Sequence, residues 1–235
     1  DGDMDIVSAS ENDDTIAWYE NDGAENPTFT AADIATSADG AASVYVADLD
    51  NDGDMDIVSA SMDDNTIAEY QNNLPALDAR SFAAADITTS ADAARSTFAA
   101  DIDGDGDMDI VSASFGDHTI AWYENDGAAN PSWTAADIAT NATGASSVFA
   151  ADMDNDGDLD ILSASKFDDT IAWYENDGAA DPSFSAANIA TSADGALSVF
   201  AADMDGDGDM DIVSASDSDD TIAWYENDGA ADPSF

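Results

Sequence analysis

The chain has 235 residues, of which 53 are Asp or Glu and only three are Lys or Arg, so its formal net charge is −50 at pH 7. This balance argues against nucleic acid as a partner, because nucleic-acid binding depends on Lys and Arg that neutralise phosphates. It also argues against insertion into or attraction to an anionic membrane surface, which favours basic segments. Apolar residues make up 44% of the chain, too many for a disordered acidic tail. Cations are therefore the partner that its charge favours.

A repeat of about 51 residues runs through the whole chain. Its marker is a glycine inside an Asp-rich loop, and successive marker glycines are 51, 53, 51 and 51 residues apart, at Gly2, Gly53, Gly106, Gly157 and Gly208. Periods of this length are typical of propellers and solenoids. We predict a single repeat domain over 1–235, with units at about 1–40, 41–93, 94–144, 145–195 and 196–235.

Four strand-like segments fit within each unit. Phe29–Thr36 and its later copy Phe184–Ala190 predict an outer strand, although their many alanines could be misread as helix. Ser198–Ala202 leads into the Asp-rich loop, Asp211–Ala215 leaves it, and Thr221–Glu226 precedes an Asn-Asp-Gly turn. Four strands per unit is the proportion of a propeller blade. We therefore predict an all-β fold, a β-propeller or an open propeller-like array of four-stranded blades.

The first and last units are partial, and both contain the second and third strands. They cannot merge into one blade without duplicating those strands. Three arrangements remain open: a five-bladed ring that closes imperfectly, further repeats outside these residues, or ends completed by another molecule. The sequence favours a piece of a longer array.

Each unit carries an Asp-rich loop that can surround a hard cation with oxygen atoms. Counted from the first Asp of a loop, positions one, three, five and nine offer carboxylates, and position seven offers a backbone carbonyl. In order of position, the candidate ligands are Asp48, Asp50, Asp52, Asp54 and Asp56; Asp101, Asp103, Asp105, Asp107 and Asp109; Asp152, Asp154, Asp156, Asp158 and Asp160; and Asp203, Asp205, Asp207, Asp209 and Asp211. The first unit retains only Asp1 and Asp5 of the carboxylate positions, with Asp3 at the carbonyl position, so we do not expect it to bind unaided.

Calcium is the ion that this pattern favours. It tolerates an irregular shell of six or seven oxygens, whereas magnesium requires octahedral geometry and retains water. Soft metals are disfavoured because the chain has no Cys and a single His. An EF-hand is excluded, since it needs Glu at position twelve, where the second unit has Ser59, and flanking helices. The remaining alternative is a solvated acidic turn without an ion. We predict about four Ca²⁺ ions, one for each complete loop.

The Asp-x-Asp-x-Asp-Gly-x-x-Asp loop, followed by the run Ile-Ala-Trp-Tyr-Glu-Asn-Asp-Gly, resembles the FG-GAP/VCBS repeat family over essentially the whole chain. These repeats are similar to the calcium-bearing blades of the integrin α-subunit propeller. The resemblance implies a secreted or cell-surface propeller with calcium in the inner hairpin of each blade. Members of the family usually build more blades than the five counted in this chain.

Two sets of aromatic residues recur once per unit. The first comprises Trp18, Trp122, Trp173 and Trp224, with Glu69 in the second unit; the other comprises Phe29, Phe82, Trp133, Phe184 and Phe235. Packing between blades is the favoured interpretation of the tryptophans, and stacking on sugars is the alternative. The second set is predicted to lie in the core. The second unit also departs from the repeat at 71–75, which drift explains better than a binding site.

We expect an extracellular protein with a structural or adhesive role. The repeated serines suit strands better than a unique nucleophile, and His118 has no repeated partner, so we do not expect an enzyme. Calcium is the expected ligand. Glycans, or another copy of the chain that pairs with the edges of the terminal blades, are the alternatives left open.

Overall fold

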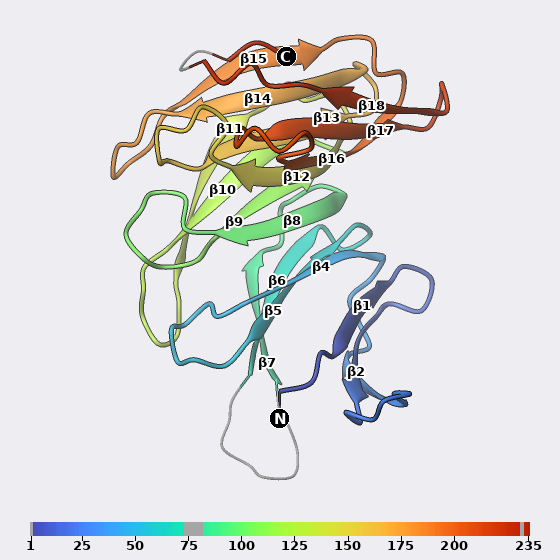
Figure 1. Cartoon of the computed structure of the whole chain (residues 1–235). Coiled ribbons are helices and arrows are strands. Elements are labelled where there is room, and N and C mark those ends of the chain that lie inside the picture. The colour runs from blue at the N-terminus through green and yellow to red at the C-terminus, as the bar shows by residue number, and fades with distance from the viewer. Residues whose placement is uncertain (1, 73–81, 231–232) are drawn as a thin grey trace.

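The computed structural model describes residues 2–72, 82–230 and 233–235, and within these ranges it contains eighteen strands and no helix. The strands form five antiparallel sheets, each a meander in which consecutive strands are hydrogen-bonded neighbours. We number the sheets 1 to 5 in chain order. Figure 1 shows them following one another as a series, from sheet 1 in blue to sheet 5 in red. The prediction of an all-β repeat fold is confirmed.

Sheets 2, 3 and 4 have four strands, and sheets 1 and 5 have three. The strands are β1 (Ile6–Ser10), β2 (Thr15–Asn21) and β3 (Phe29–Ala35) in sheet 1; β4 (Ala41–Ala47), β5 (Asp56–Ser61), β6 (Thr66–Asn72) and β7 (Phe82–Thr88) in sheet 2; β8 (Ala94–Ala100), β9 (Asp109–Ser114), β10 (Thr119–Asn125) and β11 (Trp133–Ala139) in sheet 3; β12 (Ala145–Ala151), β13 (Asp160–Ser165), β14 (Thr170–Asn176) and β15 (Phe184–Ala190) in sheet 4; and β16 (Ala196–Ala202), β17 (Asp211–Ser216) and β18 (Thr221–Tyr225) in sheet 5.

The second strand of each complete sheet is buried on both of its faces. In β5, β9 and β13 every residue is buried, serines included. Both faces are covered because neighbouring sheets pack against each side, so the strand is nearly continuous in small and apolar residues instead of alternating with polar ones. The alanine-rich fourth strands expose their middle residues, as β7, β11 and β15 show, and are outer strands as predicted.

The first strands of sheets 2 to 5 contact one another in succession and form the inner side of the series. Each contributes one ring to an aromatic ladder of Tyr45, Phe98, Phe149 and Phe200. The ring centroids lie 4.7, 4.7 and 4.6 Å apart, within the range of favourable tilted aromatic pairs. The ladder places the loops that follow these strands side by side.

The same residue is enclosed in one copy of the repeat and uncovered in another. Ile161, on β13, is completely buried between sheets 3 and 4. Ile6 holds the same position on β1, where no described sheet covers that face, and it is 49% exposed. The environment of this isoleucine is therefore decided by the neighbouring sheet.

This contrast gives a matched test of the stacking. Ile161→Ala is expected to lower the free energy of unfolding by about 2–5 kcal/mol, because it removes a fully buried side chain. Ile6→Ala is expected to cost less than half as much in dilute solution. Urea unfolding followed by tryptophan fluorescence measures both. Equal losses would mean that sheet 1 is covered in solution.

Candidate metal sites

Each Asp-rich loop joins the first strand of a sheet to the second, and two left-handed residues give the loop its curvature. At position six the glycines have φ between 92° and 104°, a region that other residues rarely adopt. Position four also has positive φ and alternates between Asn and Gly along the chain, as in Asn51 (58°) and Gly104 (75°). These two bends lie on either side of the Asp at position five.

Three carboxylates converge in each of the four complete loops. One oxygen from each of the three lies within 4.8 Å of the other two. The triads are Asp48, Asp50 and Asp56; Asp101, Asp103 and Asp109; Asp152, Asp154 and Asp156; and Asp203, Asp205 and Asp207. Positions one and three therefore meet in every loop, joined by position nine in sheets 2 and 3 and by position five in sheets 4 and 5. Of each predicted set of four carboxylates, three lie together.

Hydrogen bonds within the loop hold the carboxylates of positions one and three in place. The amide of the position-six glycine donates to the first Asp in every loop, as from Gly106 to Asp101 Oδ2 at 3.1 Å. The amide of position five donates to the Asp at position three in the same way, as from Asp105 to Asp103 Oδ1 at 3.1 Å. The other oxygen of the position-one Asp has no hydrogen-bond partner among the described residues in Asp48 and Asp101, whereas in Asp152 and Asp203 it accepts from a further loop amide.

The position-nine carboxylate ties the loop to the rest of its sheet. Asp109 is buried, and its two oxygens accept the amides of Ile102 at 3.1 Å and of Asn125 at 2.8 Å. Asp56, Asp160 and Asp211 make the equivalent pair of bonds. Each carboxylate oxygen can still accept from a second direction. This residue thus closes the loop onto the third strand, in addition to any contact with an ion.

Burial makes the charged form of these carboxylates costly. Desolvation raises the pKa of Asp109 to about 7, against the opposing effect of the hydrogen bonds from Asn125 and Ile102. It raises the pKa of Asp56 and of Asp160 to about 6 in the same manner. The pKa of Asp103, at position three, is also raised, first by burial and then by the charges of Asp105 and Asp101. A cation held within the triad would favour the charged form of each.

In sheets 3, 4 and 5 an asparagine that follows or ends the third strand joins neighbouring loops, a role that its place in an Asn-Asp-Gly turn does not predict. Asn125 donates from Nδ2 to Met108 O in its own loop at 3.0 Å and to Leu49 O in the loop of the preceding sheet at 2.8 Å. Asn176 and Asn227 repeat both contacts. The recurrence of this asparagine in every unit is the feature of the sequence that indicates a structural role. The loops are therefore fastened to one another as well as to their sheets.

The position-seven side chains pack under the turn that follows the third strand. A Cβ added to Gly127 would lie 2.1 Å from Asp107 Oδ2, and Gly178 and Gly229 stand in the same relation to Asp158 and Asp209. Asp107 Oδ1 also accepts from Asn51 of the preceding loop at 2.6 Å. These glycines also have a φ of 65°, which favours glycine, and any side chain there would displace the Asp; both facts account for the repeated Asn-Asp-Gly. The backbone carbonyl at position seven, which in sheet 2 belongs to Asp54, remains a predicted ligand.

The first copy of the loop differs from the others. Asp1 lies outside the described residues, and Asp5 accepts from Trp18 Nε1 at 3.0 Å and from the amide of Asn21 at 2.9 Å. Asp3 lies against Gly23, like its position-seven equivalents. The carboxylate clusters found among the described residues all belong to the complete loops.

The repeated tryptophans pack between sheets where a following sheet exists. Trp122 and Trp173 are buried in the cores between sheets 3 and 4 and between sheets 4 and 5. Enclosed indoles cannot stack on sugars, so packing accounts for these two. Trp224 is exposed, and so is Phe29, which was predicted to lie in the core. Both lie on sheet faces that no other described sheet covers.

Glu69 is buried in place of the repeated tryptophan, and a second exception compensates for it. Trp133 replaces the usual phenylalanine at the facing position of sheet 3, and its Nε1 donates to Glu69 Oε2 at 3.2 Å. Burial raises the pKa of Glu69 to about 7, opposed by this hydrogen bond. The segment 73–75 of the same divergent unit lies outside the described residues.

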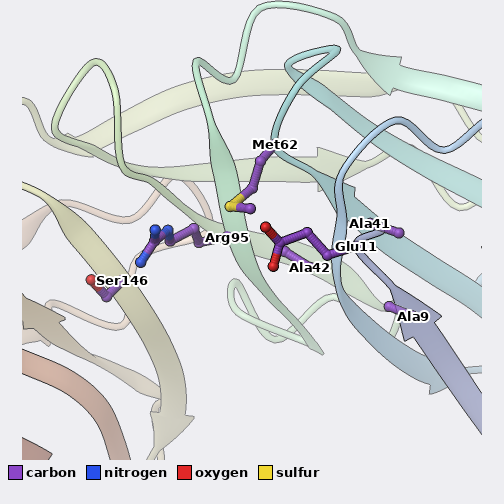
Figure 2. A pocket seen from close by; sticks show the side chains of 7 residues that line it. All are labelled: Ala9, Glu11, Ala41, Ala42, Met62, Arg95 and Ser146. Atoms are coloured by element: carbon purple, nitrogen blue, oxygen red, sulfur yellow. The ribbon is translucent and has the colours of Figure 1, made fainter. Parts of the chain in front are cut away.

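At the end of the sheets opposite the Asp-rich loops, a pocket of about 390 Å³ opens beside the first strands. Figure 2 shows Glu11, Met62 and Arg95 around it, together with Ser146 and three alanines. Arg95 lies 4.0 Å from the ring centroid of Phe115. The lining contains one acidic side chain, Glu11, and one cationic side chain, Arg95. These lining residues do not form a set of nucleophile, general base and orienting group.

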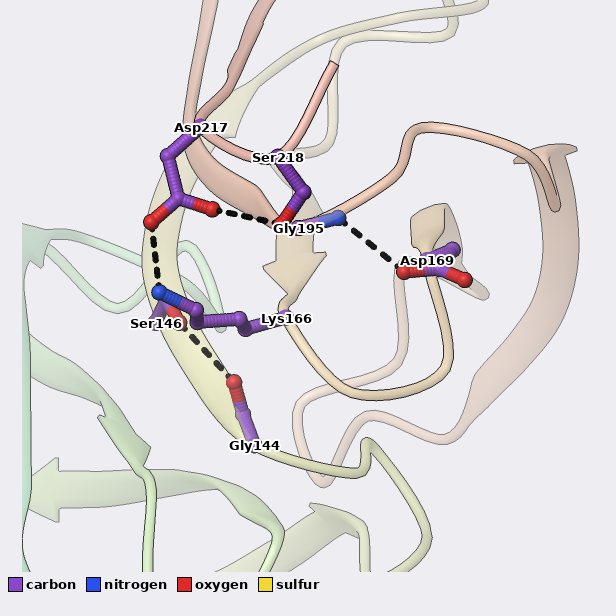
Figure 3. A network of polar contacts seen from close by, with 7 residues as sticks. All are labelled: Gly144, Ser146, Lys166, Asp169, Gly195, Asp217 and Ser218. Carbon is purple, nitrogen blue, oxygen red and sulfur yellow. Dashed lines mark hydrogen bonds and ion pairs between the residues drawn. The ribbon is translucent and has the colours of Figure 1, made fainter.

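At the same end, polar contacts join adjacent sheets. Lys166 Nζ lies 2.6 Å from Asp217 Oδ2, and the amide of Gly195 donates to Asp169 Oδ1 at 3.0 Å. Both contacts, drawn in Figure 3, link sheets 4 and 5. The ion pair is partly exposed, so it contributes little to stability.

A family model described as FG-GAP-like repeat matches residues 1–59, 48–112, 101–163, 156–214 and 203–234. The chain belongs to the FG-GAP-like repeat family. Among solved structures, the V. cholerae biofilm matrix protein Bap1 is similar, with a TM-score of 0.52 and 20% sequence identity. The match covers 98% of this chain and 38% of Bap1, so the chain spans well under half of that protein. At this identity the likeness concerns the fold. No match was found among curated proteins.

The raised pKa values predict an unusual pH dependence for the cation-free protein. The folded state holds protons on Asp56, Asp109 and Asp160 at pH values where the unfolded chain, with Asp near ~3.9, has released them. Stability is therefore greatest below about pH 4 and is lost as the pH rises through about 6–7. We expect the melting temperature in chelator to fall between pH 5 and pH 8.

Asp109→Asn should make the loss of stability with pH less steep, by the contribution of about one proton, since the neutral amide does not titrate. Asp181→Asn changes the same charge at an exposed position outside the loops and should leave the slope as it is in the wild type. A melting temperature that rises with pH in chelator would contradict the assignment.

Proposed function

We propose that the chain is an extracellular, calcium-binding β-propeller or propeller-like array that has a structural or adhesive role and no enzymatic activity. The observation that carries this proposal is the recurrence of a carboxylate triad at the same place in four successive sheets. Three carboxylates within 4.8 Å repel one another strongly unless a cation lies between them.

Buried atoms of the loops support an ion as the missing partner. Asp48 Oδ1 and Asp101 Oδ1 are buried, and neither has a hydrogen-bond partner among the described residues. A buried acceptor without a partner is costly, and a cation in the triad would satisfy it. All the donors are hard oxygens, which suits calcium better than a soft metal.

The residues have distinct parts in such a site. Positions one and three would hold the ion in every loop, with position five or nine as the third ligand. Position nine would also keep the loop fastened to the third strand, through the bonds described for Asp109. When bound, calcium supplies charge neutralisation and a cross-link between the two strands that flank the loop. Folding and ion binding would then be coupled.

The setting and role rest on composition and on the comparisons. A chain without Cys cannot rely on disulfides, and calcium cross-links would take their place in a calcium-rich medium outside the cell. No helix among the described residues is long and apolar enough to cross a membrane. The V. cholerae biofilm matrix protein Bap1 shares this fold, which favours a structural or adhesive role.

Calcium should raise the thermal stability of the chain. At a calcium concentration one hundred times the Kd, each site is expected to add about 2.7 kcal/mol. Calorimetric melts in excess chelator and in calcium measure the difference, and magnesium at equal concentration should restore less of it. A melting temperature that is the same in chelator and in calcium would contradict the proposal.

Asp103→Asn should lower the number of tightly bound calcium ions by one, because it removes one charge of a triad yet keeps an oxygen that can accept from the amide of Asp105. Equilibrium dialysis counts the ions. Asp181→Asn is the matched control, and its count should equal that of the wild type.

A further inference from the structure

The copies of the repeat differ most at the end of the sheets opposite the Asp-rich loops. At three positions no two copies carry the same residue, whereas most other positions carry the same residue or a closely similar one. One is the second residue of the first strand, and the other two begin the turn between the second and third strands. In chain order they are Ala42, Arg95, Ser146 and Leu197; Glu11, Met62, Phe115, Lys166 and Asp217; and Asn12, Asp63, Gly116, Phe167 and Ser218.

These positions lie together because the first strand of a sheet begins beside the end of the second. Ala94 pairs with Ser114 in sheet 3, so Arg95 lies next to the turn that begins with Phe115. Residues at the same positions of neighbouring sheets line the pocket of about 390 Å³ around Arg95. Repeated packing fixes the other positions, so this end is where the copies can form a single, asymmetric site.

Arg95 has no acidic partner, although the chain carries 53 acidic residues. Its guanidinium forms no salt bridge and no hydrogen bond with the described residues, and its Nε is buried. The ring of Phe115 lies 4.0 Å from Arg95 Cζ, and Phe167 packs against that ring with centroids 4.9 Å apart. Lys166, the other cation among the described residues, is paired with Asp217. A buried donor without an acceptor is costly, which indicates that an anionic partner is missing.

Arg95 lies in the middle of the described array. Sheet 3, which carries it, lies between sheets 2 and 4, and both of these have four strands. Figure 2 shows its guanidinium directed towards Ser146 of sheet 4, on the side of the pocket away from Glu11 of sheet 1. Ser146 is buried and donates to Gly144 O at 2.9 Å, so its oxygen can still accept a hydrogen bond from a ligand. The unpartnered guanidinium therefore lies between complete sheets.

We propose that the pocket at Arg95 binds a small organic carboxylate, either a sugar acid or a free organic acid. A guanidinium presents parallel N–H donors that match the two oxygens of a carboxylate. The ring of Phe115 holds the guanidinium beforehand, so less side-chain freedom is lost on binding. The volume of about 390 Å³ is within the range of small-molecule sites.

The charge of the chain narrows the class of anion. A net charge of −50 repels anions, and it repels a doubly charged one such as sulfate more strongly than a singly charged carboxylate. The pocket lies at the opposite end of the sheets from the carboxylate triads. The site therefore goes beyond the proposed function and does not rest on calcium binding.

Isothermal titration calorimetry of the whole chain in calcium tests the proposal, with D-galacturonate and propionate as carboxylate probes. Binding of galacturonate alone identifies a sugar acid as the source of the carboxylate, and binding of propionate identifies a free acid. Neutral D-galactose and doubly charged sulfate should bind more weakly than the carboxylate that binds. The bound carboxylate should also raise the melting temperature of the wild type.

Variants at this end of the sheets assign the binding to Arg95. Arg95→Gln should weaken carboxylate binding by about tenfold or more, because it removes a charged, bidentate donor. Arg95→Lys keeps the charge without the fork and should also bind more weakly than the wild type, which preserves the test if Arg95→Gln does not fold. Lys166→Gln is the matched control: it removes the same charge at the same end and should leave the affinity as in the wild type.

Several results would overturn the proposal. Neither carboxylate might be expected to bind at millimolar concentrations if Arg95 only packs against Phe115, and a silent titration would establish this. Galactose binding as tightly as galacturonate, or sulfate binding more tightly, would exclude a carboxylate site. A carboxylate that binds Arg95→Gln normally but loses affinity in Asp103→Asn or in chelator would be bound to calcium in the loops. That result would overturn the Arg95 site and support the calcium proposal, so the two proposals fail separately.

Discussion

A sheet that is apolar on both faces buries both of them only when it lies between two others, and the rest of the structure depends on this constraint. The second strands β5, β9 and β13 bury every side chain, serines included, because neighbouring sheets cover both sides. Stability in such an array is set by contacts between neighbours, as in other repeat proteins. The aromatic ladder of Tyr45, Phe98, Phe149 and Phe200 runs through the array and links four sheets.

The carboxylate triads depend on this stacking. Position-nine carboxylates such as Asp109 are held by amides of their own sheet, while Asn125 fastens its loop to the loop of the preceding sheet. Packing thus forces acidic groups into a desolvated region, where the pKa of Asp109 rises to about 7. The cost of burying these charges and the proposed affinity for a divalent cation would have the same origin. An ion bound in each triad would cross-link the two strands that flank its loop.

Variation between the copies follows the same logic. Glu69 departs from the repeated tryptophan, and Trp133 across the interface departs from the repeated phenylalanine, so that a buried carboxylate gains an indole donor. Position four of the loops alternates between Asn and Gly, and where it is Asn it reaches the next loop, as Asn155 does to Asp209 Oδ1 at 2.7 Å. In both cases a residue that varies between copies forms a hydrogen bond with a residue of the next sheet.

The sequence by itself determined the period, the all-β class, the order of strands and the loops where carboxylates gather, because these follow from local spacing and turn residues. It could not determine which carboxylates meet: Asp56 joins its triad and Asp160 does not, although their loops are nearly identical in sequence. It also could not show that Asn125 connects two loops, since that bond spans 76 residues. Only the tertiary structure decided which faces are covered. Ile120 and Ile222 occupy the same position of the repeat, yet one is completely buried and the other exposed, because burial belongs to the neighbouring sheet and not to the residue.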